Sequence, residues 1–535
     1  MQSANPKDLP IVIVGAGPVG LLTALGLAHY GIPSVIYEDD RHLSLDTKAG
    51  TILTRTLEIF SRYHVADAVL AKSLRVDEIG EIDRRTGKSA YPLLLGELAA
   101  ETRYPFVINL PQQDLEPILA EAALRCGLVQ IKMGHKLERF EDHGEYVTLH
   151  LTTEGRELST EAAFLLACDG GRSTVRTQML GVQVEGMSLP VKYALVDLVV
   201  DLDNENPRDY PYLAYFADPV EWMILVRHPH CWRFLYPMAE GASEPTAEEL
   251  RDKSLSFIGQ VTNVKVINRV TYHVHHRVAK TWRSGRVFLM GDAAHLITPM
   301  WALGLNTGAL DASNLPWRLS WFLRGWATAN VLDGYEREQH SLAVHGSGAM
   351  AEAARQSMAQ RSADVTGLTA NNWSNAYTRS LLGVRLGVES PNDWKMVVTE
   401  TRPPVVAGDR LPDYLVHTPE GRAERIHDVC LGSFTALYFC DVRRRHLIPL
   451  NSSPALRHYA VSRFDAPHDS GLRDRSLLDP GSVLTARLAI PNNTLVLVRP
   501  DEYIAAIVPM DGMANQAARL YERVTGMPPA PAAAP

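Results

Sequence analysis

The chain has 535 residues, of which 46% are hydrophobic and 21% charged, and its formal net charge is −8. This length predicts roughly two to four domains with sizeable cores, and the acidic balance argues against nucleic acid as a partner. The five cysteines form no CxxC pair, so neither a disulfide framework nor a metal site is indicated. The N-terminal MQSANPKD is too short and polar for a signal peptide, so we expect a cytoplasmic protein with no membrane span.

The first thirty residues after Asp8 predict a strand, a tight turn, a helix and a second strand. The short β-branched run Ile11 to Val14 is typical of a buried parallel strand, and an Ala/Leu-rich helix follows the sequence GAGPVG. Glycines in this spacing permit the turn, admit a pyrophosphate and let helix and strand pack closely, while an acid about 20 residues on binds ribose hydroxyls. The alternatives are a glycine-rich turn without a ligand or a membrane span, against which the glycines and the proline argue. The expected dinucleotide contacts are Gly15, Gly17, Pro18, Gly20 and Glu38.

The next hundred residues predict a second crossover followed by a β-meander. A loop carries Lys48, a cation close in sequence to the expected phosphate site, and a helix starts near Arg55. Short alternating pieces between residues 73 and 110 indicate strands, and PQQDLEPILAEAALRCG indicates a helix that Gly127 stops. Four strands follow up to CDGGRSTVR, where a buried strand ends on Asp169 and Gly170. A plain Asp-Gly turn is the alternative interpretation of that motif.

Residues 187–276 are rich in Val, Tyr, Phe and Trp in short runs, which predicts a mostly antiparallel sheet. Such a sheet, inserted in a dinucleotide-binding fold, can form the floor of a substrate pocket. The candidate pocket residues are Tyr212, Trp222, Trp232 and, from a later loop, Trp301.

Residues 285–325 predict a buried strand, a loop and another glycine-containing helix start. The strand Arg286 to Met290 ends on Gly291-Asp292, and GLNTG begins the helix. Its NH groups would stabilise negative charge on the far end of a ligand. An ordinary glycine-rich loop that merely starts a helix is the alternative. A Pro-rich stretch from Arg402 then introduces a separate C-terminal domain, and the Pro/Ala tail 528–535 is low in complexity and expected to be disordered.

These motifs, in this order, resemble the single-component FAD-dependent aromatic hydroxylases, the p-hydroxybenzoate hydroxylase-like flavoprotein monooxygenases, over most of residues 8–360. GAGPVG with Glu38 resembles the family's ADP-binding site, CDGGRSTVR its DG motif, and GRVFLMGDAAH its GD motif. The resemblance implies non-covalently bound FAD, NADPH or NADH as reductant, and O₂. By the same resemblance the further cofactor contacts are Lys48, Gln112, Asp169, Gly170, Asp292, Pro299 and the backbone of Gly304, Leu305 and Asn306.

Residues 408–526 resemble the thioredoxin-like C-terminal domain of the phenol and 3-hydroxyphenylpropionate hydroxylase subgroup. Without a CxxC this domain cannot run dithiol chemistry, so we expect a structural role or an oligomer contact such as a homodimer interface. The expected fold class is therefore α/β: a Rossmann-like FAD-binding domain with an inserted, mostly antiparallel substrate sheet and a thioredoxin-like C-terminal domain. The expected boundaries are FAD-binding segments at 1–72, 107–186 and 277–400, substrate-domain segments at 73–106 and 187–276, the C-terminal domain at 401–527 and the tail.

Two departures from the family pattern stand out. Lysine replaces the usual arginine at position 48, and a lysine cannot make a bidentate phosphate pair. The triplet Trp301, Ala302 and Leu303 replaces the Gly-Gly-Gln that often precedes the helix glycine, so a tryptophan is expected beside the flavin.

The resemblance implies that NAD(P)H reduces FAD, that O₂ adds at the flavin C4a, and that the hydroperoxide hydroxylates a small phenolic or aromatic molecule. A substituted phenol, a nitrocatechol or a hydroxyaryl acid would fit, and a nitro or halogen group on the attacked carbon would be expelled. A phenol is activated by losing its proton, and the candidates for base or phenolate stabilisation are His275, His276, Arg277 and Tyr215. The alternatives are Baeyer–Villiger oxidation or ring cleavage on the same fold, and a non-catalytic FAD-binding protein.

Overall fold

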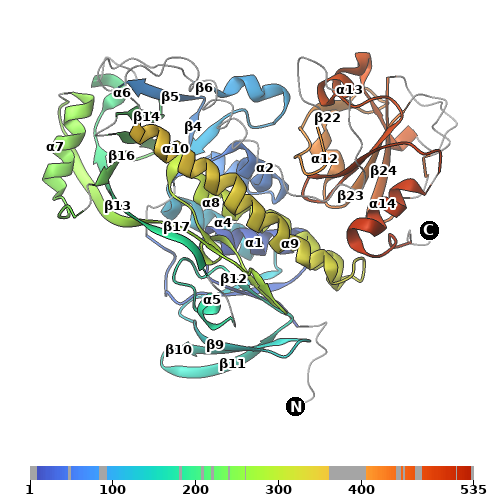
Figure 1. The fold of residues 1–535 in the computed structure, drawn as a ribbon, viewed down its shortest axis with the longest axis horizontal. Coiled ribbons are helices and arrows are strands. Elements are labelled where there is room, and N and C mark those ends of the chain that lie inside the picture. Colours follow the sequence, from blue (N-terminus) through green and yellow to red (C-terminus); the bar gives the residue numbers. More distant parts are fainter. Residues whose placement is uncertain are drawn as a thin grey trace. The chain divides into compact units, whose positions relative to one another are not determined.

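The computed structural model describes residues 9–45, 50–83, 93–179, 184–205, 210–218, 222–238, 241–259, 261–360, 405–440, 448–449, 452–463, 473–513 and 515–531. The chain divides into two compact units (Figure 1). The first comprises Met1–Ala99, Tyr104–Ala312 and Ala343–Gly383, and the second Ala100–Arg103, Ser313–Leu342 and Val384–Pro535. The boundary predicted between residues 400 and 401 and the last four residues of the tail lie outside the described residues.

A six-stranded sheet in the order β18-β19-β12-β1-β2-β8 forms the centre of the first unit. The strand β1 (Ile11–Val14) is parallel to both of its neighbours, and all four of its residues are buried, as expected for a sheet covered on both faces. The helices α1 (Pro18–His29) and α4 (Gln112–Arg125) pack against each other. The remaining strands are β2 (Ser34–Tyr37), β8 (Val129–Lys132), β12 (Phe164–Ala167), β18 (Arg283–Ser284) and β19 (Val287–Leu289). The predicted strand, turn and helix succession is confirmed here.

An antiparallel meander follows β8. It consists of β9 (Lys136–Asp142), β10 (Val147–Thr153) and β11 (Arg156–Ala162). The short helix α5 (Thr174–Gln178) packs against β9 (Figure 1). The strand β11 was not predicted as a separate strand from the sequence.

The large sheet has eight strands in the order β20-β17-β13-β16-β15-β14-β5-β6. Its neighbouring pairs are antiparallel except for β14 with β5, which confirms the expected mostly antiparallel sheet. The longest strands are β13 (Val184–Val199) and β17 (Lys265–Ala279). The others are β5 (Glu78–Asp83), β6 (Leu93–Leu94), β14 (Leu213–Ala217), β15 (Met223–His228), β16 (Cys231–Met238) and β20 (His295–Leu296).

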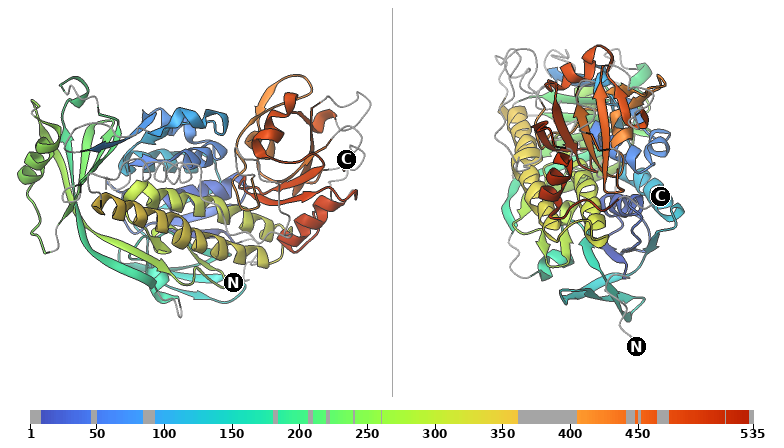
Figure 2. Two further views of the ribbon diagram at one scale, coloured as in Figure 1. Left: turned by 45° about the horizontal axis from the view of Figure 1, so that its top comes forward. Right: turned by 90° about the vertical axis from the view of Figure 1, so that its right-hand side faces the viewer.

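Apolar side chains cover both faces of this sheet. The face here called the inner face contributes Tyr193, Tyr215 and Trp222 to a buried cluster that also contains Trp301, and we call this group the inner cluster. The opposite, outer face contributes Trp232 to a second cluster that includes residues of α7 (Ala247–Ile258). Figure 2 shows α7 on the outer side of the sheet. This helix was not predicted from the sequence, although Thr246 and Glu249 form a capping box at its start.

A small antiparallel sheet in the order β3-β7-β4 supplies more of the inner cluster. Its strands are β3 (Thr51–Ile52), β7 (Val107–Asn109) and β4 (Leu74–Val76), and the helices α2 (Thr54–Arg62), α3 (Ala66–Leu70) and α6 (Leu202–Glu205) also belong to this unit. Short 3₁₀ turns lie at Leu95–Ala100, Gly291–Ala293 and Met300–Ala302. Further along the chain come α8 (Leu303–Leu323), α9 (Asn330–Ser341), a π-helical turn at Leu342–Gly348 and α10 (Ala349–Gln360).

The C-terminal part of the second unit contains a seven-stranded mixed sheet in the order β22-β21-β25-β24-β23-β26-β27. Its strands are β21 (Leu415–His417), β22 (Ala423–Arg425), β23 (Phe434–Phe439), β24 (Leu456–Ser462), β25 (Ser476–Leu478), β26 (Thr494–Val498) and β27 (Ile504–Pro509). The helices are α12 (Ile426–Cys430), α13 (Val483–Leu488) and α14 (Gln516–Thr525), with 3₁₀ turns at Arg473–Arg475 and Pro480–Ser482. The thioredoxin-like assignment of this domain stays a prediction. Across the described ranges of the chain, no helix has both the length and the apolar character needed to cross a membrane.

Candidate cofactor and substrate site

The three glycines of the first motif have different surroundings. Gly15 has a φ of 105°, and a Cβ there would lie 2.2 Å from the carbonyl oxygen of Cys168. A Cβ on Gly20 would lie 2.0 Å from the carbonyl oxygen of Gly15, so this glycine lets α1 approach the turn. A Cβ on Gly17 would meet no atom within 4 Å, although Gly17 is the N-cap of α1. The first and third glycines therefore serve the fold, and the second leaves an open cradle at a helix N-terminus, where an anion binds best.

Glu38 closes the glycine-rich loop from the end of β2. Its Oε2 accepts a hydrogen bond from the backbone NH of Ala16 at 2.6 Å, and its Oε1 accepts one from the NH of Asp40 at 3.1 Å. A carboxylate has about four acceptor sites, so these two bonds leave capacity for ribose hydroxyls. The side chain thus fixes the loop as well as standing where a ribose is expected.

Gln112 acts on the loop after β2 through another side chain. Its Nε2 donates to Oε1 of Glu116 at 2.7 Å, and Oε2 of Glu116 accepts from the backbone NH of Ser44 at 3.0 Å. Glu116 is buried, which makes this connection a fixed part of the fold. Lys48, the other cofactor residue predicted in this region, lies outside the described residues.

The DG motif forms a junction with the GD loop. Oδ2 of Asp169 accepts from the NH of Val175, the second residue of α5, at 3.1 Å, whereas its buried Oδ1 has no hydrogen-bond partner. Burial raises the pKa of Asp169. Arg176 donates to the carbonyl oxygens of Ala293 at 2.8 Å and Gly171 at 2.6 Å. The orphaned carboxylate oxygen next to this junction is an unused acceptor for a ligand donor.

A buried histidine–aspartate pair holds the GD loop, a role that was not predicted from the sequence. Oδ2 of Asp311 accepts from the NH of Gly291 at 2.8 Å and lies 2.9 Å from Nε2 of His295. Both side chains are fully buried, and the Trp282 ring stacks on the histidine at 5.2 Å. Asp292, the predicted ribose or ribityl contact, is exposed on the 3₁₀ turn that this pair supports. An aspartate within the apolar start of α8 was the available signal.

Two glycines set the distance between α1 and the start of α8. A Cβ on Gly291 would lie 3.0 Å from Cγ2 of Val19, and a Cβ on Gly308 would lie 2.5 Å from the same atom. Val19 follows Pro18 in the first turn of α1, so both helix N-termini belong to one tightly packed region.

The loop between Pro299 and α8 is bent and fixed by Asn306. Trp301 and Ala302 both have left-handed backbones, with φ of 57° and 56°. Nδ2 of Asn306 donates to the carbonyl oxygens of Ala302 at 2.7 Å and Thr51 at 3.0 Å. Its Oδ1 accepts from the NH of Leu53 at 2.9 Å and from a threonine hydroxyl, Thr56, at 2.6 Å. The resemblance implied a role for the backbone of Asn306, and the structure adds that its side chain ties this loop to the segment 51–56. The backbone of Gly304 and Leu305 lies in the same first turn of α8.

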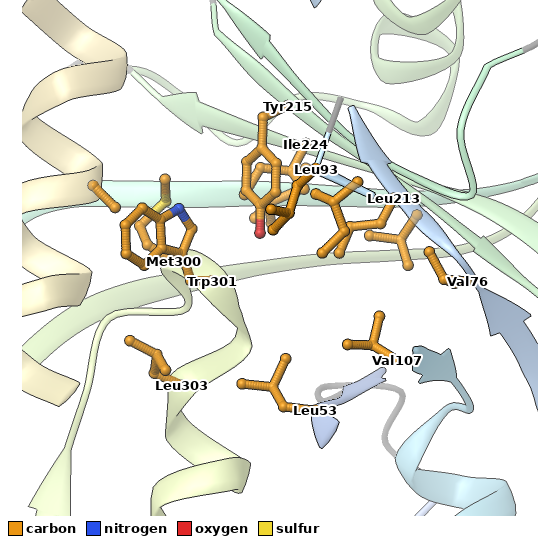
Figure 3. Packing of buried hydrophobic residues seen from close by; sticks show 14 of the residues in the cluster. Leu53, Val76, Leu93, Val107, Leu213, Tyr215, Ile224, Met300, Trp301 and Leu303 are labelled. Atoms are coloured by element: carbon orange, nitrogen blue, oxygen red, sulfur yellow. The ribbon is translucent and has the colours of Figure 1, made fainter. Parts of the chain in front are cut away.

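The aromatic candidates separate onto two faces of the large sheet. Tyr215, Trp222 and Trp301 are buried together in the inner cluster, and Tyr212 packs against it. In Figure 3 the Tyr215 hydroxyl points away from the sheet, toward the side on which Leu53 and Leu303 lie. Trp232 belongs to the outer cluster, against which Tyr212 also packs, and the place of both residues in a substrate pocket stays a prediction.

Two further tyrosines were not singled out from the sequence: Tyr193 belongs to the inner cluster, and Tyr272 packs against it. Tyr193 and Tyr272 are direct partners across β13 and β17, with ring centroids 6.0 Å apart in an edge-to-face arrangement. Tyr193 also meets Trp222 edge-to-face at 5.3 Å. The aromatic wall is therefore continuous across several strands. Burial raises the pKa of Tyr272, so its hydroxyl stays protonated.

The candidate proton-transfer residues do not form one group. His275, His276 and Arg277 follow one another on β17, opposite residues 186–188 of β13, and a Cβ on Gly348 would lie 2.8 Å from Cε1 of His276. Burial, with help from Arg277, lowers the pKa of His275. Four strand spacings separate β17 from the strand of Tyr215, or about 19 Å along a sheet. Tyr215 and these β17 residues therefore lie on well-separated strands of the sheet.

Comparison with known proteins decides the family. The model of the FAD binding domain family matches residues 8–345. The chain belongs to this family. It is 28% identical over 340 residues to para-nitrophenol 4-monooxygenase of Pseudomonas sp. (strain WBC-3), covering 62% of this chain and 83% of that protein. It is 31% identical over 353 residues to 3-(3-hydroxy-phenyl)propionate/3-hydroxycinnamic acid hydroxylase of Burkholderia cenocepacia (strain HI2424), covering 63% of this chain but 62% of that protein.

A solved structure extends the match to almost the whole chain. The ternary complex of aklavinone-11 hydroxylase with FAD and aklavinone superposes with a TM-score of 0.79 at 26% identity, covering 97% of this chain and 99% of that one. These matches are to monooxygenases and hydroxylases of aromatic molecules, as the motifs predicted, and FAD is the cofactor of this chain.

Proposed function

We propose that the protein hydroxylates a phenolic ring with NAD(P)H and O₂, with FAD held by the motifs described above. The observation that carries this proposal is the position of Trp301. This residue belongs to the loop that Asn306 ties to the segment 51–56, and it also belongs to the aromatic inner cluster of the large sheet. One loop thus joins the cofactor motifs to an aromatic wall that suits a planar ring.

The residues present fit FAD. The open cradle at Gly17 and the N-terminus of α1 would hold its pyrophosphate, Glu38 its adenosine ribose, and the exposed Asp292 its ribityl chain. When bound, FAD supplies the oxygen-transfer chemistry after reduction by NAD(P)H and reaction with O₂. The work of the chain is to bind, orient and shield the reacting ring.

Positioning falls to the inner cluster. Its aromatic side chains would contact the ring edge-to-face and exclude water, which protects a reactive oxygen donor from wasteful decay. We propose that Oη of Tyr215 forms a hydrogen bond with the phenolic oxygen of the substrate, because this hydroxyl points away from the sheet toward the side of Leu53 and Leu303 (Figure 3). His275, His276 and Arg277 lie on a distant part of the sheet, and we propose for them a role outside the reacting ring.

The test is NADH and NADPH oxidation with oxygen uptake by the FAD-loaded protein across phenols, catechols, nitrophenols and hydroxyaryl acids. We expect a ring-dependent increase in oxidation together with a hydroxylated product, and release of nitrite where the attacked carbon carries a nitro group. Oxidation that yields only hydrogen peroxide with every ring would contradict hydroxylation. A protein that binds no FAD would contradict the whole assignment.

Assembly and location complete the proposal. We propose a cytoplasmic enzyme, consistent with five cysteines that are all free thiols. We further propose a homodimer, which sedimentation velocity of the holoenzyme would test. A monomer at micromolar concentration would contradict it.

A further inference from the structure

A buried ion pair lies on the inner face of the large sheet. Asp197 of β13 and Arg233 of β16 are direct cross-strand partners, and their side chains are 1% and 5% exposed. Nε of Arg233 donates to Oδ1 of Asp197 at 2.8 Å, and Nη2 donates to Oδ2 at 3.0 Å. Asn268 of β17 adds a donor to Oδ2 of the same carboxylate at 3.3 Å. The aspartate therefore occupies the bidentate fork of the arginine.

Strand alternation sets this pair beside the aromatic wall. Tyr193 and Leu195 precede Asp197 in two-residue steps, and both belong to the inner cluster. Leu235 follows Arg233 by the same step, and the register partner of Arg233 on β15 is Val226; both are members of that cluster too. The pair thus continues the surface that would bind the substrate ring.

The neighbouring basic groups do not offer a positive charge on this face. His228, two residues after Val226, is fully buried, and burial together with Arg233 and Arg227 holds its pKa well below its ordinary value. Arg227 lies on the outer face, where its guanidinium stacks over Trp232. Arg269, also on the outer side, donates to the carbonyl oxygen of Pro245. Among the described side chains of β13, β15 and β16, Arg233 is the cation of the inner face, and it is already paired.

We infer that Asp197 is a specificity-determining residue: by occupying Arg233 it makes the site accept uncharged phenols and reject aryl carboxylates. This inference rests on the proposed function and chooses among the substrate classes that it leaves open. A carboxylate brought to this wall would be desolvated beside a buried aspartate, and like charges in such a position oppose binding strongly. A neutral substituent meets no such penalty.

The test uses two rings of matched shape, 3-propylphenol and 3-(3-hydroxyphenyl)propanoate, with the FAD-loaded holoenzyme. Binding is measured by isothermal titration calorimetry and turnover by kcat/KM. For the natural sequence we expect at least about tenfold preference for the neutral ring in both measurements. Asp197→Asn keeps an oxygen opposite Arg233 but leaves the positive charge of Arg233 unneutralised. In this variant we expect the preference for the neutral ring to fall about tenfold or to reverse. Asp201→Asn is the matched control, because it neutralises an exposed aspartate just beyond β13 and should leave the ratio unchanged.

The outcomes separate this inference from the proposed function. If the natural protein binds the acid as well as or better than the neutral ring, the role of Asp197 is refuted while hydroxylation stands. If it binds neither ring and no aromatic stimulates NAD(P)H oxidation, both fail. Should Asp197→Asn not fold, the double variant Asp197→Leu with Arg233→Met removes both charges. Because the repelling carboxylate is gone, this variant should bind the acid better than the natural protein does, and an unchanged preference for the neutral ring would contradict the inference.

Discussion

Replacing Gly17 by alanine should separate cofactor binding from folding. The residue has φ of −67° and ψ of 176°, which alanine adopts without strain, and its added Cβ would meet no protein atom within 4 Å. Alanine at an N-cap costs about 0.5–1 kcal/mol, and the reduced freedom of the unfolded chain returns about 0.4–1 kcal/mol, so the stability of the apoprotein should hardly change. The same Cβ would enter the cradle where a pyrophosphate must approach the backbone.

The expected loss of FAD affinity follows from crowding by one methyl group. A cost of about 1–3 kcal/mol corresponds to a dissociation constant raised roughly 5- to 150-fold. Quenching of FAD fluorescence measures this constant, and thermal unfolding of the apoprotein measures stability. Gly20→Ala is the matched control: its Cβ would lie 2.0 Å from the carbonyl oxygen of Gly15, so that variant should lose stability as well. Wild-type FAD affinity in Gly17→Ala would refute the reasoning that this loop binds the cofactor.

Three other predictions concern buried polar groups. Asn306→Ala should leave the NH of Leu53 without its partner and lower the free energy of unfolding in denaturant by about 1–3 kcal/mol. It should also release more hydrogen peroxide per NAD(P)H oxidised than the control Asn306→Asp, which keeps the acceptor oxygen. Unchanged stability and unchanged peroxide release would contradict the proposed role of this side chain in fixing the loop. Burial opposes the charge of Glu338, but Arg318 and Arg499 outweigh burial and lower its pKa to about 2. Glu338→Ala should therefore lower the free energy of unfolding by about 3–5 kcal/mol, because it leaves two buried cations without this carboxylate. A loss below about 1 kcal/mol would contradict the importance of these ion pairs. Burial lowers the pKa of His458 from 6.5 to about 4, so as the pH falls the unfolded form binds a proton before the folded form does. The free energy of unfolding that is present above pH 6.5 should therefore fall by up to about 3 kcal/mol as the pH drops to 4. His458→Phe should lack this component of the pH dependence, and an unaltered profile would contradict it.

Local motifs predicted the cofactor side of the fold almost residue by residue. The succession Ile11 to Glu38 is specified by neighbours in sequence: a β-branched run, glycines at fixed spacing and a proline in the first helical turn. Chemistry that depends on such short segments can be predicted from the amino-acid sequence alone. For the same reason the capping box at Thr246 was available as a signal for α7 but was overlooked among the surrounding strand patterns.

Contacts between segments that are distant in sequence could not be predicted from local sequence patterns. An aspartate within the apolar start of α8 signals a buried carboxylate, but nothing local indicates that Asp311 would meet His295 and Gly291. Asn306 likewise reaches the segment 51–56, about 250 positions away. In both regions the sequence contains a recognisable polar residue, Asp311 or Asn306, but its hydrogen-bond partners are determined by tertiary packing.

The face on which an aromatic residue lies was the hardest feature to predict. Alternation identifies residues that share a face, but apolar cores cover both faces of the large sheet, so polarity does not tell which face binds a ligand. For this reason the sequence could not tell that Trp232 lies on the outer face and Tyr193 on the inner face. The pair of Asp197 and Arg233 shows the same limit, since its partners lie 36 positions apart in sequence.

Hydroxylation by this protein requires that one oxygen atom of O₂ is transferred to an aromatic ring. The most direct measurement is mass spectrometry of the product formed by the FAD-loaded protein with NAD(P)H, a phenol that stimulates oxidation, and ¹⁸O₂. We expect a hydroxylated ring that carries one ¹⁸O atom per molecule with ¹⁸O₂ and none when the label is in water. An unlabelled product, or an unchanged phenol with NAD(P)H oxidation yielding only hydrogen peroxide, would contradict it.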